Sequence, residues 1–120
     1  MSDKFVTVDR QSYSFTLWAV NTVRADVATW GMLTQVSRSR IEAAIRSVAD
    51  DVRPIARLAP NQLELTVAKV RGTLALLESL TQAVHSARKV MTDDRRHVLG
   101  LIARAKKGFR QYIQLDLFNP

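Results

Sequence analysis

Side chains suited to acid–base or metal chemistry are few and scattered in this sequence. The chain has two histidines, His85 and His97, and no cysteine. The carboxylate pairs at residues 50–51 and 93–94 are adjacent in sequence, and neighbouring side chains on a helix diverge by about 100°, so neither pair suits one shared cation. The four glycines are too far apart to form a phosphate-binding loop. We therefore expect no catalytic residue, no metal, no cofactor and no enzyme activity.

The last residues of the chain predict an interaction site. Leu115, Leu117 and Phe118 are large apolar side chains in a segment, residues 113–120, that is too short to build a core of its own. Exposed apolar clusters mark interaction sites. Gln114 adds directional hydrogen bonds to the area that such a cluster can bury against a partner.

The pentapeptide Gln114-Leu115-Asp116-Leu117-Phe118 closely resembles the motif by which many bacterial proteins bind the DNA sliding clamp, Gln-Leu-(Ser or Asp)-Leu-Phe, and matches it at all five positions. The resemblance implies that Gln114 enters a small polar pocket of the clamp and that Leu117 and Phe118 fill a deep hydrophobic one. It also implies that Leu115 covers a shallow apolar patch and that Asp116 faces solvent. The alternative is that this tail folds back onto the core of its own domain.

A net charge of +7 predicts attraction to polyanions at low salt. Six basic residues of the last predicted helix are candidates for non-specific contacts with nucleic-acid phosphates: Arg95, Arg96, Arg104, Lys106, Lys107 and Arg110. Trp18 and Trp30 are expected on about the same side of a predicted helix. We interpret both as core residues rather than as a platform on which bases stack.

The elements that must position these residues are predicted to be helices, because glycine and proline are few and apolar residues recur every three or four positions. A first helix begins at residues 9–12 and is either continuous or bent near Gly31. Pro54 and Pro60 place a connection between Asp51 and Asn61. A second helix follows from Asn61 and carries its apolar face as far as Met91.

A third helix begins at residues 92–94, where a capping residue precedes two acidic ones. Its apolar face is Val98, Ile102, Ala105 and Phe109, and it ends near Gln111. The prediction is an all-α protein, a three-helix antiparallel bundle over residues 1–112 with a short extended clamp-binding tail at 113–120. No internal repeat is apparent in the sequence.

The composition, with 47% hydrophobic residues, no signal peptide and no long apolar run, predicts a cytoplasmic protein without a membrane contact. The leading hypothesis is an accessory factor of DNA replication or repair that binds the clamp at the replisome, or an inhibitor that competes for the clamp pocket. One alternative is a basic helical protein that binds DNA. Another is an oligomeric scaffold that joins copies through the apolar faces of residues 20–33 and 63–91.

Overall fold

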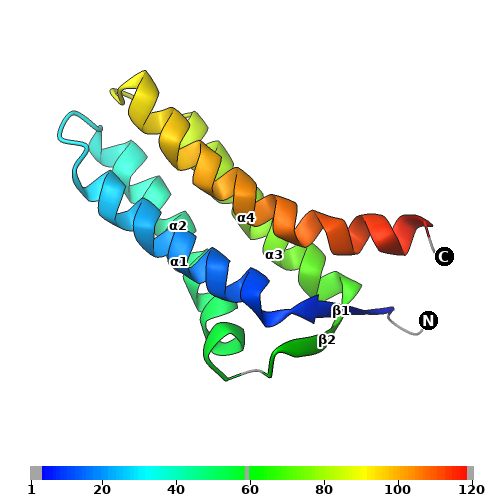
Figure 1. Cartoon of the computed structure of the whole chain (residues 1–120). Helices are drawn as coiled ribbons and strands as arrows, with labels where there is room; N and C mark the ends of the chain where they lie inside the picture. The colour runs from blue at the N-terminus through cyan, green and yellow to red at the C-terminus, as the bar shows by residue number, and fades with distance from the viewer. Residues whose placement is uncertain (1–3, 59, 119–120) are drawn as a thin grey trace.

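The computed structural model describes residues 4–58 and 60–118, without the side chains of Leu58 and residues 114–118 (Figure 1). It is mostly helical, with four helices and one small sheet. In chain order the elements are β1 (Phe5–Asp9), α1 (Arg10–Ala28), α2 (Gln35–Leu58), β2 (Gln62–Thr66), α3 (Val67–His85) and α4 (Thr92–Phe118).

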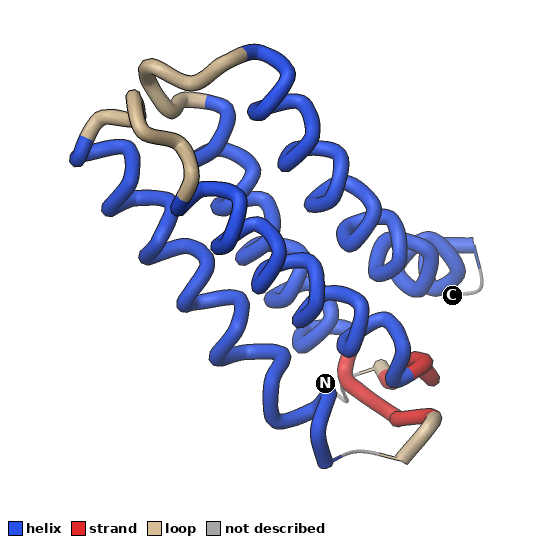
Figure 2. Tube along the Cα trace, turned by 60° about the vertical axis from the view of Figure 1, so that its left-hand side comes forward, coloured by secondary structure: helices blue, strands red, loops and turns tan. Residues whose placement is uncertain are grey.

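The four helices form an antiparallel bundle that is closed at one end by a two-stranded ribbon (Figures 1 and 2). Each helix packs against two others, α1 against α2 and α4, and α3 against α2 and α4. Strands β1 and β2 pair antiparallel, with Thr7 opposite Glu64 at the centre. The connections α1–α2 and α3–α4 lie together at the other end, which we call the loop end (Figure 2).

Local signals account for the helix starts. The Asp9 carboxylate accepts a hydrogen bond from the Gln11 amide at 2.9 Å and so caps α1. The Thr66 hydroxyl accepts one from the Lys69 amide at 3.1 Å and caps α3 in the same way. Helix α4 starts at Thr92, as predicted, with two acidic residues in its first turn.

The core lies along the axis of the bundle and takes residues from all four helices. The predicted inner face of α4 is confirmed, because Val98, Ile102, Ala105 and Phe109 are all buried. Tyr13 is fully buried and meets Phe109 edge-on, with 4.9 Å between ring centroids. Such an aromatic pair contributes about 0.5–1.5 kcal/mol of stability beyond the contribution from burying the two rings.

The prediction of three helices is wrong, since the chain forms four. The predicted first helix ends at Ala28, turns back through residues 29–34 and continues as α2, a separate antiparallel helix. The connection expected between Asp51 and Asn61 starts later, because α2 runs through Pro54 to Leu58. A proline lacks one backbone N–H and so removes a single hydrogen bond, and only the last four residues of α2 follow it.

Both strands are missing from the sequence-based prediction. Residues 62–66 fall in the predicted second helix, but they form β2, and α3 starts only at Val67. Their alternation of polar and apolar side chains, Gln-Leu-Glu-Leu-Thr, is typical of a strand with one buried face. The partner strand β1 is separated from β2 by the whole of α1 and α2, so local patterns alone give little support for the pairing.

An internal repeat is evident in the structure, although none is apparent in the sequence. One constant offset in residue number converts β1 (Phe5–Asp9) into β2 (Gln62–Thr66) and α1 (Arg10–Ala28) into α3 (Val67–His85). The same offset takes the start of α2, Gln35, to the start of α4, Thr92. The chain is therefore built as two β–α–α units joined in tandem.

The ribbon pairs the two units about a local twofold axis. The Arg10 amide donates to the Asn61 carbonyl, and the Val67 amide donates to the Lys4 carbonyl, both at 2.9 Å. Under the offset between the units, Arg10 corresponds to Val67 and Lys4 to Asn61. Each hydrogen bond is therefore the symmetry equivalent of the other.

Equivalent side chains in the two units also make equivalent contacts. Arg38 donates to the Trp30 carbonyl at 2.6 Å, and its counterpart Arg95 donates to the Ala87 carbonyl at 2.6 Å. Thr16 and Thr73 are both fully buried, and each donates to the carbonyl of the preceding helical turn. The repeat therefore extends to individual hydrogen bonds at the ends and in the middle of the helices.

Among the described residues, no helix combines the length and the apolar character needed to cross a membrane.

Candidate functional site

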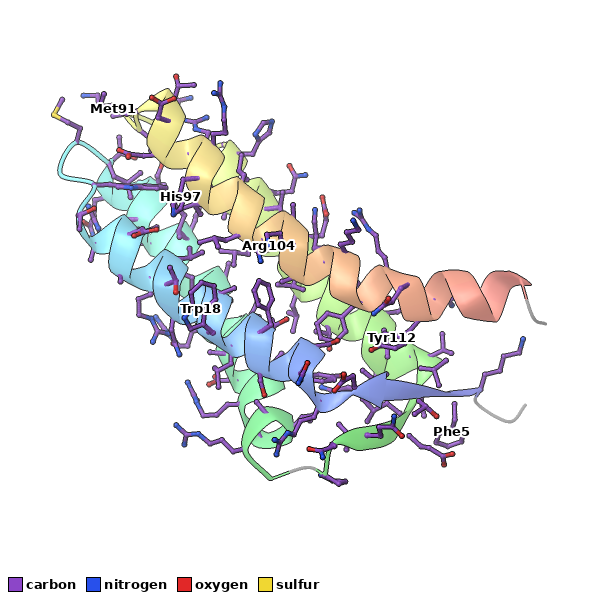
Figure 3. The ribbon with its side chains drawn as sticks, viewed as in Figure 1. Phe5, Trp18, Met91, His97, Arg104 and Tyr112 are labelled. Carbon is purple, nitrogen blue, oxygen red and sulfur yellow. The ribbon has the colours of Figure 1, made fainter. Side chains whose placement is uncertain are left out.

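The candidate clamp-binding segment is the end of α4. The last side chains described before it hold this part of α4 against the start of the bundle. The Tyr112 hydroxyl accepts a hydrogen bond from the Asp9 amide at 3.1 Å and lies 3.4 Å from the Ser12 hydroxyl. Ile113 is half-buried and packs on the core cluster. Tyr112 lies where α4 passes the start of α1 (Figure 3).

The helix does not end near Gln111 as predicted but continues to Phe118. The extended tail that the sequence predicted is therefore helical up to that residue. The side chains of Gln114, Leu115, Asp116, Leu117 and Phe118 lie outside the described part of the structure, so their predicted roles stay predictions.

Three of the six basic residues predicted to contact nucleic acid are engaged within the protein. Arg95 donates to the carbonyls of His85 and Ala87 at 2.8 and 2.6 Å, which satisfies the end of α3. Arg104 lies over the Phe15 ring, 5.2 Å from its centroid, but its side chain stays exposed. Lys106, only 9% exposed, donates to Glu78 at 2.8 Å, and this hydrogen bond lowers the pKa of the Glu78 carboxyl.

The other three, Arg96, Lys107 and Arg110, are exposed on α4. Arg96 lies 3.9 Å from Asp93 in an exposed ion pair, which contributes little to stability. The structure thus presents to solvent only part of the basic surface that the sequence predicted on this helix.

The interpretation of both tryptophans as core residues holds for Trp30 but not for Trp18. Helix α1 ends before Trp30, so the two side chains do not share a helix face. Trp18 on α1 is 53% exposed, and its ring lies 5.7 Å from that of Phe15 (Figure 3). Trp18 thus forms an exposed aromatic pair with Phe15, whose ring the Arg104 guanidinium covers.

The two histidines lie apart. His85 is exposed at the end of α3, and His97 on α4 lies 3.5 Å from the Asp26 carboxylate of α1. No three histidine or acidic side chains among the described residues come together as metal ligands would. A cysteine ligand is excluded by the sequence itself.

Comparison with known proteins assigns the chain to no group. No protein-family model, curated protein or solved structure matches it. Any function must therefore be argued from the residues themselves.

Proposed function

We propose that this protein binds a bacterial DNA sliding clamp through Gln114–Phe118. The observation that carries the proposal is the complete match of these five residues to the clamp-binding motif. On this proposal, the protein acts at the replisome either as a replication or repair accessory factor or as an inhibitor that occupies the clamp pocket.

The repeat supports a separate role for the end of the chain. In the first unit, the residues equivalent to 114 and 115 are Arg57 and Leu58, which lead into the connection to β2. In the second unit the helix continues beyond the position equivalent to Leu58, as far as Phe118. The last described side chains that anchor this helix to the bundle are Tyr112 and Ile113. Residues 116–118 therefore have no counterpart in the helix of the first unit.

Calorimetry with a purified bacterial clamp tests the proposal. We expect saturable binding by the full chain and loss of binding in the double variant Leu117→Ala/Phe118→Ala, since each large apolar side chain contributes about 1.5–3 kcal/mol when buried. The matched control is Val36→Ala/Met91→Ala, which removes two exposed apolar side chains at the loop end and should bind like the parent. A folded parent chain that does not bind would refute the proposal.

A second candidate function, binding of single-stranded nucleic acid, is favoured by the cluster of Trp18, Phe15 and Arg104. Exposed Lys107 and Arg110 lie further along α4 and could contact phosphates. The two functions are distinguishable by Trp18→Ala, which should weaken oligonucleotide binding and leave clamp binding unchanged. An oligomeric scaffold through residues 20–33 and 63–91 stays a prediction, but the apolar faces it relied on are largely buried within one chain.

A further inference from the structure

A cavity of about 390 Å³ lies at the loop end. This end of the bundle is opposite the ribbon and the end of α4 (Figure 1). It is formed between the start of α2 and the connection from α3 to α4. The residues that line it are Thr34, Val36, Ser37, Arg40, Ser86 and Arg88. Its volume is in the range of sites that take small molecules.

The chemistry of this lining is that of an anion site. Two exposed arginines and three residues with hydroxyl groups line one space, and no carboxylate lines it. Among the described residues, neither the Arg40 nor the Arg88 guanidinium has a hydrogen bond or an ion pair. Planar guanidinium groups bind phosphate oxygens in pairs, and two of them balance a double negative charge.

Hydrogen bonds hold the two walls of the cavity together. The Arg88 amide donates to the Ser37 hydroxyl at 3.0 Å, and the Thr34 hydroxyl donates to the same oxygen at 2.9 Å. The Thr34 amide in turn donates to the Arg88 carbonyl at 3.4 Å. Ser37 is 7% exposed, so this junction is a fixed part of the fold. The backbone segments that carry both arginines are therefore positioned before any ligand arrives.

The internal repeat allows the two arginines of the cavity to be compared with their equivalents in the other unit. The positions equivalent to Ser37, Arg40 and Arg88 in the other unit are Asp94, His97 and Gly31. These three residues line two smaller cavities of about 150 and 120 Å³ at the same end of the bundle. The capping arginines are the same in both units, whereas the two arginines of the cavity have no arginine counterpart. The helical hairpin of the other unit therefore forms without arginines at these two positions.

We propose that this cavity binds a small dianion of the phosphate monoester class, with Arg40 and Arg88 as the groups that hold the phosphate. The Thr34 and Ser86 hydroxyl groups already donate to Ser37 and to the Gln82 carbonyl, whereas the Ser37 hydroxyl only accepts within the protein and can donate to a remaining oxygen. Val36, 63% exposed at the rim, offers an apolar contact to the organic part of the ligand. The site is independent of the clamp-binding proposal, since it lies at the opposite end of the bundle.

The test is a titration of the ¹⁵N-labelled full chain with phenyl phosphate, followed by NMR at constant ionic strength. We expect saturable shifts at the amides of Ser37, Ser86 and Arg88. Arg40→Gln/Arg88→Gln should weaken binding by at least about tenfold, because each charge-assisted hydrogen bond is worth more than a neutral one. The control Arg46→Gln/Arg71→Gln removes the same charge from exposed positions elsewhere and should change the affinity by less than about twofold.

Arg88→Gly is a second variant that guards against a folding defect. It installs the residue that the other unit carries at this position, and the hydrogen bond from residue 88 to Ser37 comes from the backbone. Its melting temperature should equal that of the parent protein, and it should still lose binding of phenyl phosphate. Equal weakening in the control variant, or shifts centred elsewhere, would show general charge attraction and overturn the proposal. So would binding at these arginines by an oligonucleotide but not by phenyl phosphate.

Discussion

Tyr13 is fully buried in the core, and its hydroxyl differs in its contacts from most other buried polar groups in the described structure. The Tyr13 hydroxyl is buried and has no hydrogen bond of ordinary geometry in the described structure. Nearby, Asp51 pairs with Lys69 and accepts a hydrogen bond from Thr73 at 2.8 Å. Burial raises the pKa of Tyr13 to about 12, because the phenolate would lose its hydration.

The raised pKa of Tyr13 predicts a loss of stability in alkali. In the unfolded chain the phenol ionises near pH 10, whereas in the folded protein it keeps its proton up to about pH 12. The stabilisation is therefore complete below pH 10 and is lost as the pH rises to 12, by about 3 kcal/mol. Urea unfolding at a series of pH values would measure this loss.

The variant Tyr13→Phe isolates this contribution. It should keep the neutral-pH stability within about 1 kcal/mol, since the lost hydroxyl was buried without a partner. It should also show a smaller decrease in the free energy of unfolding between pH 10 and 12. Tyr112→Phe, which leaves Tyr13 in place, should keep most of the decrease, because burial is the largest cause of the raised pKa of Tyr13 and Tyr112 a smaller one. An identical alkaline profile for the Tyr13 variant and the parent would contradict the assignment.

The helices depend on arginines that close the preceding helix. Arg38, in the first turn of α2, donates to the carbonyls of Val27 and Trp30 at 3.0 and 2.6 Å. Arg95 does the same for α3 from the first turn of α4. In each unit one side chain thus donates to carbonyls at and just after the end of a helix and fixes the turn between two antiparallel helices.

We expect Arg38→Ala and Arg95→Ala each to lower the free energy of unfolding by about 1–3 kcal/mol, because carbonyls lose charge-assisted hydrogen bonds. The two losses should be similar, since the sites are equivalent. Arg46→Ala, on the exposed face of α2, should change stability by less than about 0.5 kcal/mol. Chemical denaturation measures all three variants. A negligible loss of stability in Arg95→Ala would contradict this role and leave Arg95 available for contacts with nucleic acid.

The whole molecule consists of two related units that contribute different side chains to the interface between them. Tyr13 packs on Phe109 across the two units, whereas the equivalent positions hold Val70 and Val52. The ion pair between Asp51 and Lys69 also joins the units, and its equivalent is Gly108 beside Ser12. One side of the interface is therefore aromatic, and the other carries a partly buried charge pair.

This asymmetry predicts that separate fragments, residues 1–59 and 60–120, assemble with each other rather than with themselves. A dimer of the first fragment would place Asp51 opposite Ser12 and leave its charge without Lys69, which is costly for a partly buried group. Co-expression with a tag on one fragment should recover an equimolar helical complex by affinity purification and circular dichroism. Recovery of stable, folded homodimers in preference to the mixed complex would contradict the prediction.

Local sequence was enough to predict the helical class, the starts of α1 and α4, and the buried face Val98, Ile102, Ala105 and Phe109. These features depend on periodicity and on capping residues, which act within a few positions along the chain. The clamp-binding hypothesis likewise depends on five consecutive residues. It needs no tertiary structure, and the described part of the structure leaves it as a proposal.

The remaining features depend on packing between segments that are distant in sequence. The ribbon pairs strands that two whole helices separate in the sequence. The repeat is visible mainly in the bounds of the elements and in their hydrogen bonds, because few equivalent positions, such as Arg38 and Arg95, carry the same residue in both units. Packing also explains why Trp18 is exposed while Lys106 is buried. Similarly, Arg40 and Arg88 share a cavity only because two helix connections meet at one end of the bundle. Such long-range juxtapositions depend on which helices pack together, and no local pattern of residues encodes that choice.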